Sequence, residues 1–179
     1  MTDTEQFDAV HRIGASAIAD PDAQQAVWFL GALIRERIGG SSTGDALAVL
    51  EHTGHRGYNS PMHRHTRDDE TFVVLDGQVE LTVDGEHHVA EAGSAIWLAR
   101  QSLHGFVVAS AGAKFLTLHT PAGFDRFTVE AGAPARVAEG ERAIHQPDSV
   151  VPPSPEELTR IAATYGIEIV GPPPGITIA

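Results

Sequence analysis

The chain has 179 residues, with 24 acidic and 12 basic side chains and a formal net charge of −12 at pH 7. Such a surface repels phosphate backbones and anionic lipid headgroups, so we expect neither a nucleic acid nor a membrane as a partner. Cysteine is absent, which excludes a disulfide framework and any site built on a thiolate.

The length is typical of a single domain with a real hydrophobic core. No apolar run approaches the ~20 residues of a membrane span, and the acidic N-terminus lacks the basic and apolar regions of a signal peptide. Together with the absence of cysteine, these features favour the cytoplasm. Lys114 is the only lysine, which is typical of a GC-rich bacterial genome.

Most of the chain predicts short strands separated by turns. Residues 1–25 are mixed and polar and indicate an N-terminal arm. Residues 27–38 are apolar enough for one strand or two. After a glycine-rich loop, further strands are predicted at 46–52, 71–75, 78–83, 86–90, 95–98, 104–108 and 114–119. The Asp84-Gly85 pair predicts a hairpin. Many short strands with glycine-rich turns indicate an all-β antiparallel sandwich or barrel over residues 26–128.

The segment 129–179 predicts a linker, a short helix and a tail. Ser154 is a good N-cap, Pro155 suits the first helical position, and Glu157 completes a capping box. The helix is expected over 155–165 and ends at Gly166. Its apolar residues lie on one face, so we expect it to pack on the barrel or on a second subunit.

The stretch from Gly57 to Gly77 contains a set of residues typical of metal ligands. His63 and His65 are two apart, so on a strand their side chains share one face. Glu70 is five residues later, and the insert at 66–69 has turn chemistry that brings it in on the neighbouring strand. His104 begins its own strand and approaches from another side. Ten histidines are present, so chance pairing is the alternative, but the combined spacing favours a metal site.

Three imidazoles and one carboxylate are a plausible ligand set for one divalent transition metal. The nitrogen and oxygen ligands suit Ni, Co, Mn, Fe, Cu or Zn, and the sequence does not choose among them. Arg64 lies between the two histidines and is expected to point away. Asp68 and Asp69 are interpreted as turn residues, and His52 has no partner at ligand spacing.

These residues resemble the first motif of the cupin family: Gly57, five residues, His63, one residue, His65, four residues, Glu70, six residues and a second glycine. The second motif is looser. Gly93, His104 and Phe106 match it, but Ala99 stands where proline is usual and no asparagine follows the histidine. The resemblance implies a cupin double-stranded β-helix, or jelly-roll barrel, with the metal held by the three histidines and the glutamate.

Residues 26–175 further resemble single-domain cupins of the quercetin 2,3-dioxygenase type. The segments WFLGALIRERIGG, SPMHRHTRDDETFVVLDG and HTPAGFDRF carry this likeness. By resemblance, such an enzyme inserts O2 into a flavonol and expels carbon monoxide. The substrate hydroxyl would bind the metal, and Glu70 would be both ligand and base.

The walls of a substrate pocket are harder to predict than the ligands. Phe72 and Val74 share the face of Glu70, and Phe106 shares that of His104, so these three either line an apolar pocket or belong to the barrel core. Trp97 either forms part of the pocket wall or belongs to the core, and two weaker candidates are Met62 and His119. The imidazole of His119 either orients a substrate or is satisfied at a strand end.

The leading hypothesis is a metal-dependent dioxygenase that acts on a flavonol or a similar enolisable aromatic compound. Its partners would be O2, a small aromatic substrate and a second copy in a homodimer, since small barrels have exposed edges. Two alternatives stay open. One is a cupin isomerase, which would need several inward polar side chains, and the other is a non-catalytic cupin that binds metal and a small molecule.

Overall fold

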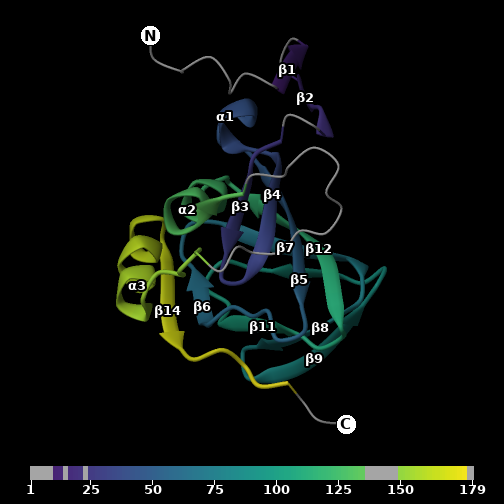
Figure 1. The fold of residues 1–179 in the computed structure, drawn as a ribbon, viewed down its shortest axis with the longest axis vertical. Helices are drawn as coiled ribbons and strands as arrows, with labels where there is room; N and C mark the ends of the chain where they lie inside the picture. The colour runs from purple at the N-terminus through teal and green to yellow at the C-terminus, as the bar shows by residue number, and fades with distance from the viewer. Residues whose placement is uncertain (1–9, 14–15, 22–23, 136–148, 177–179) are drawn as a thin grey trace.

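Two antiparallel sheets face each other around a common core in the computed structural model, which describes residues 10–13, 16–21, 24–135 and 149–176 (Figure 1). The seven-stranded sheet has the order β10(Ala95–Leu98), β7(Asp69–Asp76), β12(Gly112–Thr120), β5(Ala48–His55), β4(Ala32–Ile38), β3(Ala26–Phe29), β13(Ala133–Pro134). The five-stranded sheet has the order β14(Ile167–Gly171), β6(Met62–His65), β11(His104–Val108), β8(Gln78–Val83), β9(Glu86–Glu91). The predicted all-β barrel with a short C-terminal helix is confirmed.

A separate two-stranded sheet is formed by β1(Val10–Ile13) and β2(Ser16–Ala19) and lies at the top of Figure 1. These strands fall within the predicted N-terminal arm. Residues 1–9 of that arm and most of the predicted linker, 136–148, lie outside the described residues.

Alternating burial explains why the predicted strands form a two-layered structure. Along β7, Glu70, Phe72 and Val74 are buried, whereas the residues between them are only partly buried. Along β12, Phe115 and Thr117 are among the buried residues of the same period. A period of two places every buried side chain of a strand on the face that meets the other sheet.

Two hairpin turns contain residues with positive φ. Asp84 and Gly85 both have positive φ, 49° and 89°, as a two-residue type I′ hairpin requires, and they join β8 to β9. This hairpin was predicted. The apolar stretch at 27–38 forms two strands, because Leu30 and Gly31, with φ of 50° and 90°, turn the chain between β3 and β4.

Two helices lie together at one side of the barrel (Figure 1). The predicted one, α3(Pro155–Thr164), begins at Ser154, whose hydroxyl accepts a hydrogen bond from the Glu157 backbone N–H at 3.2 Å. The other, α2(Phe124–Ala131), was not predicted. Its N-cap Gly123 makes no side-chain cap, so the usual start signal is absent. A further single turn, α1(Gly40–Thr43), forms in the predicted glycine-rich loop.

The strand β14, which follows α3, was also not predicted. It pairs with β6 so that Ile167 lies opposite His65 and Ile169 opposite His63. The C-terminal segment therefore extends the five-stranded sheet beside the strand that carries two of the predicted ligands. A short strand that depends on such distant pairing has little local signal.

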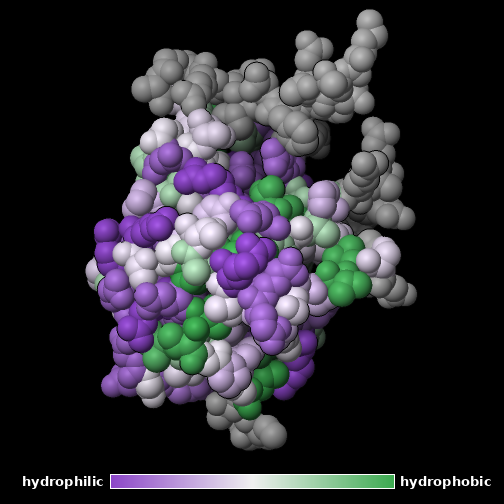
Figure 2. Space-filling view, turned by 90° about the vertical axis from the view of Figure 1, so that its left-hand side faces the viewer, coloured by the Kyte–Doolittle hydropathy of each residue, from purple (hydrophilic) through white to green (hydrophobic). Residues whose placement is uncertain are grey.

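No helix in the described part of the chain is long and apolar enough to cross a membrane. On the face drawn in Figure 2, hydrophobic residues lie in small separate groups among hydrophilic ones. Among the described residues, Trp97 is an aromatic side chain at the surface, with an exposed fraction of 66%.

Candidate metal centre and adjoining cavity

The four predicted ligands converge between the two sheets. His63 and His65 lie on β6 and His104 begins β11, directly opposite His63 in the five-stranded sheet. Glu70 comes from β7, in the seven-stranded sheet. The expectation that Glu70 enters on a strand beside the histidines is therefore wrong in one respect: β6 and β7 belong to facing sheets. Residues 66–68 carry the chain from one sheet to the other, and Asp69 begins β7.

The ligand atoms form a tight, buried cluster. Nε2 of His65 lies 3.2 Å from Nε2 of His63 and 3.3 Å from Oε2 of Glu70. Nε2 of His104 lies 3.0 Å from the same carboxylate oxygen. One donor atom from each of the four residues lies within 4.8 Å of all the others, and all four residues are buried.

The outer ring nitrogens indicate which tautomer each histidine adopts. Nδ1 of His63 lies 2.8 Å from the carbonyl oxygen of Pro61, and Nδ1 of His104 lies 3.0 Å from that of Ser102. A carbonyl oxygen can only accept, so both rings carry a proton on Nδ1. Their Nε2 lone pairs then point into the cluster, as in a metal-binding histidine held by an outer partner.

His65 is held in a different way. Its Nδ1 lies 3.0 Å from Oδ2 of Asp68, but the N–H is not aimed straight at that oxygen, so the contact is an ion pair rather than a straight hydrogen bond. The carboxylate still favours a proton on Nδ1, because a nitrogen lone pair there would face a negative charge. All three histidines thus present Nε2 to the centre.

The cluster fits a divalent transition metal. Three inward lone pairs and a carboxylate repel one another unless positive charge lies between them. A divalent ion supplies that charge, and a set of imidazole and carboxylate ligands suits the transition metals named above. The cluster could therefore bind one such ion through His63, His65, Glu70 and His104.

The protonation of the metal-free cluster follows from its charges. Burial acts to lower the pKa of His65, but Asp68 and Glu70 outweigh it and raise that pKa to about 10. Burial and the neighbouring rings of His104 and His65 lower the pKa of His63 to about 3. Burial acts to raise the pKa of Glu70, but His119, His104 and His65 hold it well below its usual value. In the metal-free protein, a protonated His65 therefore supplies the positive charge that balances the Glu70 carboxylate.

Asp68 is the main residue that the sequence interpretation missed. Expected to be a turn residue, it is 5% exposed and its Oδ2 also accepts a hydrogen bond from Nδ1 of His119 at 2.8 Å. Burial acts to raise its pKa, but the two histidines lower it to about 2. The turn interpretation is also wrong for the neighbouring Asp69, which is the first residue of β7 and whose carboxylate binds Arg100 at the surface. Nothing in the spacing of the two aspartates distinguishes them.

Both glycines that bound the first motif have a structural reason. Gly57 and Gly77 have φ of 88° and 76°, which side chains rarely adopt. At Gly77 a Cβ atom would also lie 2.2 Å from the carbonyl oxygen of Gly112. The second glycine therefore permits the close approach of two chain segments at the end of β7.

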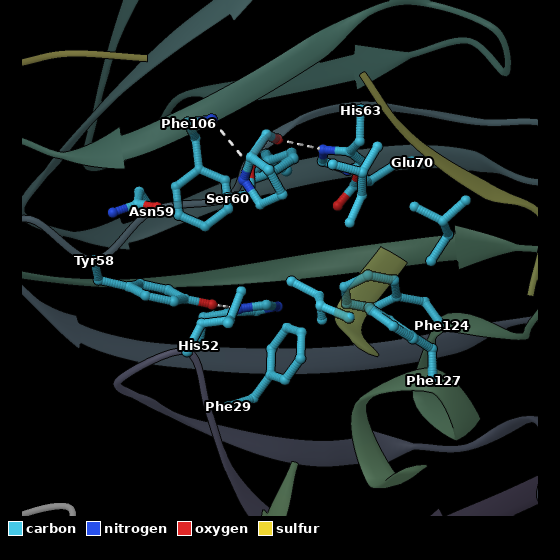
Figure 3. A pocket seen from close by; sticks show the side chains of 16 residues that line it. Phe29, His52, Tyr58, Asn59, Ser60, His63, Glu70, Phe106, Phe124 and Phe127 are labelled. Carbon is cyan, nitrogen blue, oxygen red and sulfur yellow. Dashed lines mark hydrogen bonds between the residues drawn. The ribbon is translucent and has the colours of Figure 1, made fainter. Parts of the chain in front are cut away.

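An apolar cavity of about 40 Å³ adjoins the cluster. His63 and Glu70 lie at one side of it, and His52 and Tyr58 lie across from them (Figure 3). Aromatic and aliphatic side chains form most of the remaining wall: Phe29, Leu30, Phe72, Phe106, Phe124, Phe127, Leu158, Ile167 and Ile169. Many of these come from β3, α2, α3 and β14, so segments outside the central barrel strands close the cavity.

Only some of the residues predicted to line the pocket do so in the structure. Phe72 and Phe106 line the cavity. Val74 does not, and lies in the core at 1% exposure. Both expectations for Trp97 are wrong: it lies neither in the pocket wall nor in the core, because it is exposed on the edge strand β10. Two further candidates, Met62 and His119, are not among the lining residues.

His52 and Tyr58 are cavity residues that the sequence interpretation did not identify. Nδ1 of His52 lies 2.9 Å from the hydroxyl oxygen of Tyr58, a contact visible in Figure 3. Its Nε2 lies 3.0 Å from Oγ1 of Thr117. The two residues are six apart and separated by a loop, so no strand or helix period connects them.

Comparison with known proteins gives results consistent with this geometry. Residues 49–119 match the family described as the cupin domain. Over 54 residues the chain is 41% identical to quercetin 2,3-dioxygenase of Bacillus subtilis (strain 168), a stretch that covers 30% of this chain and 16% of the length of that protein.

Solved structures match over a larger part of the chain. KdgF from Halomonas sp. is 20% identical, with a TM-score of 0.55, over 64% of this chain and 99% of that one. An RmlC-like cupin from Shewanella frigidimarina is 18% identical, with a TM-score of 0.54, over 66% and 98%. At these identities the likeness concerns the fold alone.

Proposed function

Because the chain contains a cupin domain built around a buried cluster of three histidines and one glutamate, we propose that it is a metal-dependent dioxygenase. Its substrate would be a small enolisable compound, and His63, His65, Glu70 and His104 would hold the metal. The observation that carries the proposal is that the cluster adjoins an apolar cavity, with His63 and Glu70 in its wall. The local similarity to a quercetin 2,3-dioxygenase supports the same reaction class.

The roles of the residues follow from their contacts. A bound divalent ion would supply Lewis acidity to an enolised substrate oxygen. Oε2 of Glu70 makes the short contacts to His65 and His104, whereas Oε1 lies 3.6 Å from Nε2 of His119. The low pKa of Glu70 in the metal-free cluster keeps the carboxylate ionised but makes it a weak base, so a bound ion would also have to lower the pKa of the substrate hydroxyl before Glu70 accepts its proton. The apolar wall would exclude water from that proton transfer.

The size of the cavity restricts the substrate. Pockets for drug-sized ligands usually measure roughly 300–1,000 Å³, whereas this cavity measures about 40 Å³. A fused-ring flavonol would require wall side chains such as Leu158 or Ile167 to move. We therefore place single-ring enolisable compounds ahead of flavonols as substrates.

The small volume of the cavity also favours one alternative, a non-catalytic cupin that binds metal and a small ligand. The cupin isomerase has less support, because the few polar side chains in the wall are outnumbered by aromatic and aliphatic ones. The homodimer expected from the sequence remains a proposal, which sedimentation equilibrium on the full chain would test.

Oxygen consumption by separately metallated protein tests the proposed reaction. Metal-free protein would be loaded with Mn, Fe, Co, Ni or Cu and mixed with a flavonol and with single-ring enolisable compounds such as a 3-hydroxy-4-pyrone. We expect oxygen uptake with at least one metal and greater turnover of the single-ring compounds.

Two variants separate catalysis from metal binding. Glu70→Gln should retain part of the metal but lose turnover, whereas Glu168→Gln, on the exposed side of β14, should leave turnover unchanged. No oxygen uptake with any of the metals, together with tight ligand binding, would contradict the proposed dioxygenase and support the non-catalytic alternative. Unchanged turnover in Glu70→Gln would exclude Glu70 as the base.

A further inference from the structure

A continuous series of buried side-chain contacts leads from the metal cluster to the far side of the cavity. It begins at Nδ1 of His65 and ends at the hydroxyl group of Tyr58. The successive distances are 3.0, 2.8, 3.2, 3.0 and 2.9 Å, through Asp68, His119, Thr117 and His52. Each of the six side chains belongs to a residue that is at most 7% exposed.

The direction of these hydrogen bonds follows from chemistry. The Asp68 carboxylate can only accept, so Nδ1 of His119 donates to it. In the neutral ring, Nε2 of His119 then accepts from the hydroxyl group of Thr117, which in turn accepts from Nε2 of His52. Nδ1 of His52 is left to accept from Tyr58. Burial lowers the pKa of His52 to about 3, which keeps that ring neutral, as this direction requires.

We propose that Asp68 is a positioning residue of the metal centre, fixing the ring of His65 so that its Nε2 faces the ion, and that His119 and the rest of the series hold Asp68 in place. This inference rests on the proposed metal centre. It concerns residues outside the ligand set, so the two can fail separately.

His65 differs from the other histidines in a way that makes this role testable. His63 and His104 are oriented by backbone carbonyl oxygens, which a side-chain substitution leaves in place. His65 alone among the three is oriented by a side chain. The burial of a carboxylate is costly unless it is paired, and both partners of Asp68 Oδ2 are imidazoles of the site region. By contrast, the carboxylate of Asp69, at the start of β7, remains at the surface, where it binds Arg100.

Cobalt titration of the metal-free full-length protein tests the proposal, because Co(II) gives both an affinity and a visible absorption spectrum. Asp68→Ala removes the acceptor, so we expect an affinity about 10–100-fold lower than that of the wild type, as is typical when the outer partner of a ligand is lost, and an altered spectrum. Asp68→Asn keeps an acceptor oxygen but loses the charge, and its affinity should be intermediate. Asp69→Asn makes the same chemical change one residue away and should match the wild type.

The outcomes are distinct. Affinities for Asp68→Ala and Asp68→Asn within about twofold of the wild type, with unchanged spectra, would overturn the positioning role while leaving the metal centre intact. Absence of cobalt binding by the wild type would overturn the metal centre, and the inference with it. If Asp68→Ala does not fold, as judged by circular dichroism of the metal-free protein, the comparison of Asp68→Asn with Asp69→Asn decides.

Discussion

Nε2 of His104 and Oε2 of Glu70 lie 3.0 Å apart, although one residue comes from the five-stranded sheet and the other from the seven-stranded sheet. The ligand cluster is therefore a point where the two layers of the barrel meet through polar groups. Elsewhere the layers meet through apolar side chains such as Phe106 and Phe115, whose ring centroids are 5.3 Å apart. An ion at the cluster would connect both sheets.

Metal binding should for this reason stabilise the whole domain. A ligand that binds only the folded state at 100 times its Kd contributes about 2.7 kcal/mol. We expect the Tm measured by calorimetry to rise when Co(II) or Ni(II) is added to metal-free protein and to fall again with a chelator. His88→Ala, a change at an exposed histidine, should keep the shift, and His104→Ala should lose most of it. Equal shifts in both variants would place the ion elsewhere.

Phe115 is the residue at which truncation should cost most in stability. It is 0% exposed and contacts the rings of His52, Phe72 and Phe106. Phe115→Ala should lower the free energy of unfolding by about 3–5 kcal/mol, through lost burial and an unfilled cavity. Val89→Ala, at a position 53% exposed, is the control and should change it by less than about 0.5 kcal/mol. Urea unfolding of the metal-free proteins gives both values, and similar losses would contradict the described core.

The buried His52 should make stability depend on pH. Its pKa is lowered from 6.5 to about 3, first by burial. Below pH 6.5 the ring is protonated in the unfolded chain, whereas in the folded protein it stays neutral until the pH falls to about 3. The contribution of the neutral ring to the free energy of unfolding is therefore fully present above pH 6.5. Between pH 6.5 and about pH 3 it decreases by roughly 1 kcal/mol for each pH unit.

His52→Gln should therefore flatten the fall in unfolding free energy between pH 6 and pH 4 relative to the wild type. The comparison is of slopes, because the substitution also removes contacts to Tyr58 and Thr117. The exposed His88 serves as control, and His88→Gln should keep the wild-type slope. An unaltered slope in His52→Gln would mean that this ring is not held neutral.

Truncation of the cavity wall should admit larger ligands. Leu158 lines the cavity from α3 and is 8% exposed. Leu158→Ala should increase the affinity of the metal-loaded protein for a fused-ring flavonol, measured by fluorescence titration, at a stability cost of about 2–5 kcal/mol. Val170→Ala removes a side chain that is 51% exposed and does not line the cavity, so its affinity should equal that of the wild type. Equal affinities in all three proteins would show that size does not limit binding.

Local patterns in the sequence were sufficient to predict the barrel and the cluster of three histidines and one glutamate that could bind a metal. The alternation along β7, the Asp84-Gly85 turn and the capping residues of α3 are short-range signals, and the structure agrees with them. The ligand histidines and Glu70 fall within one spaced motif. These features depend on neighbours within a few residues, which a single sequence records directly.

The remaining features depend on contacts between distant parts of the chain. Strand β14 pairs with β6 about a hundred residues earlier, and α2 forms without a capping side chain where Phe127 packs on Phe29. Asp68 is distinguished from Asp69 by its burial and by its contacts with His65 and with His119, the latter 51 residues later. No periodicity encodes such pairings, so the cavity wall and the residues around the ligands could not be predicted.

The central claim is that His63, His65, Glu70 and His104 hold one divalent transition metal, and metal analysis of the purified full-length protein tests it most directly. We predict about one equivalent per chain by mass spectrometry after growth in metal-supplemented medium. The double variant His63→Ala/His104→Ala should retain less than about a tenth of it, while His88→Ala retains all. A wild type without a stoichiometric metal, or a double variant with the wild-type content, would contradict the account.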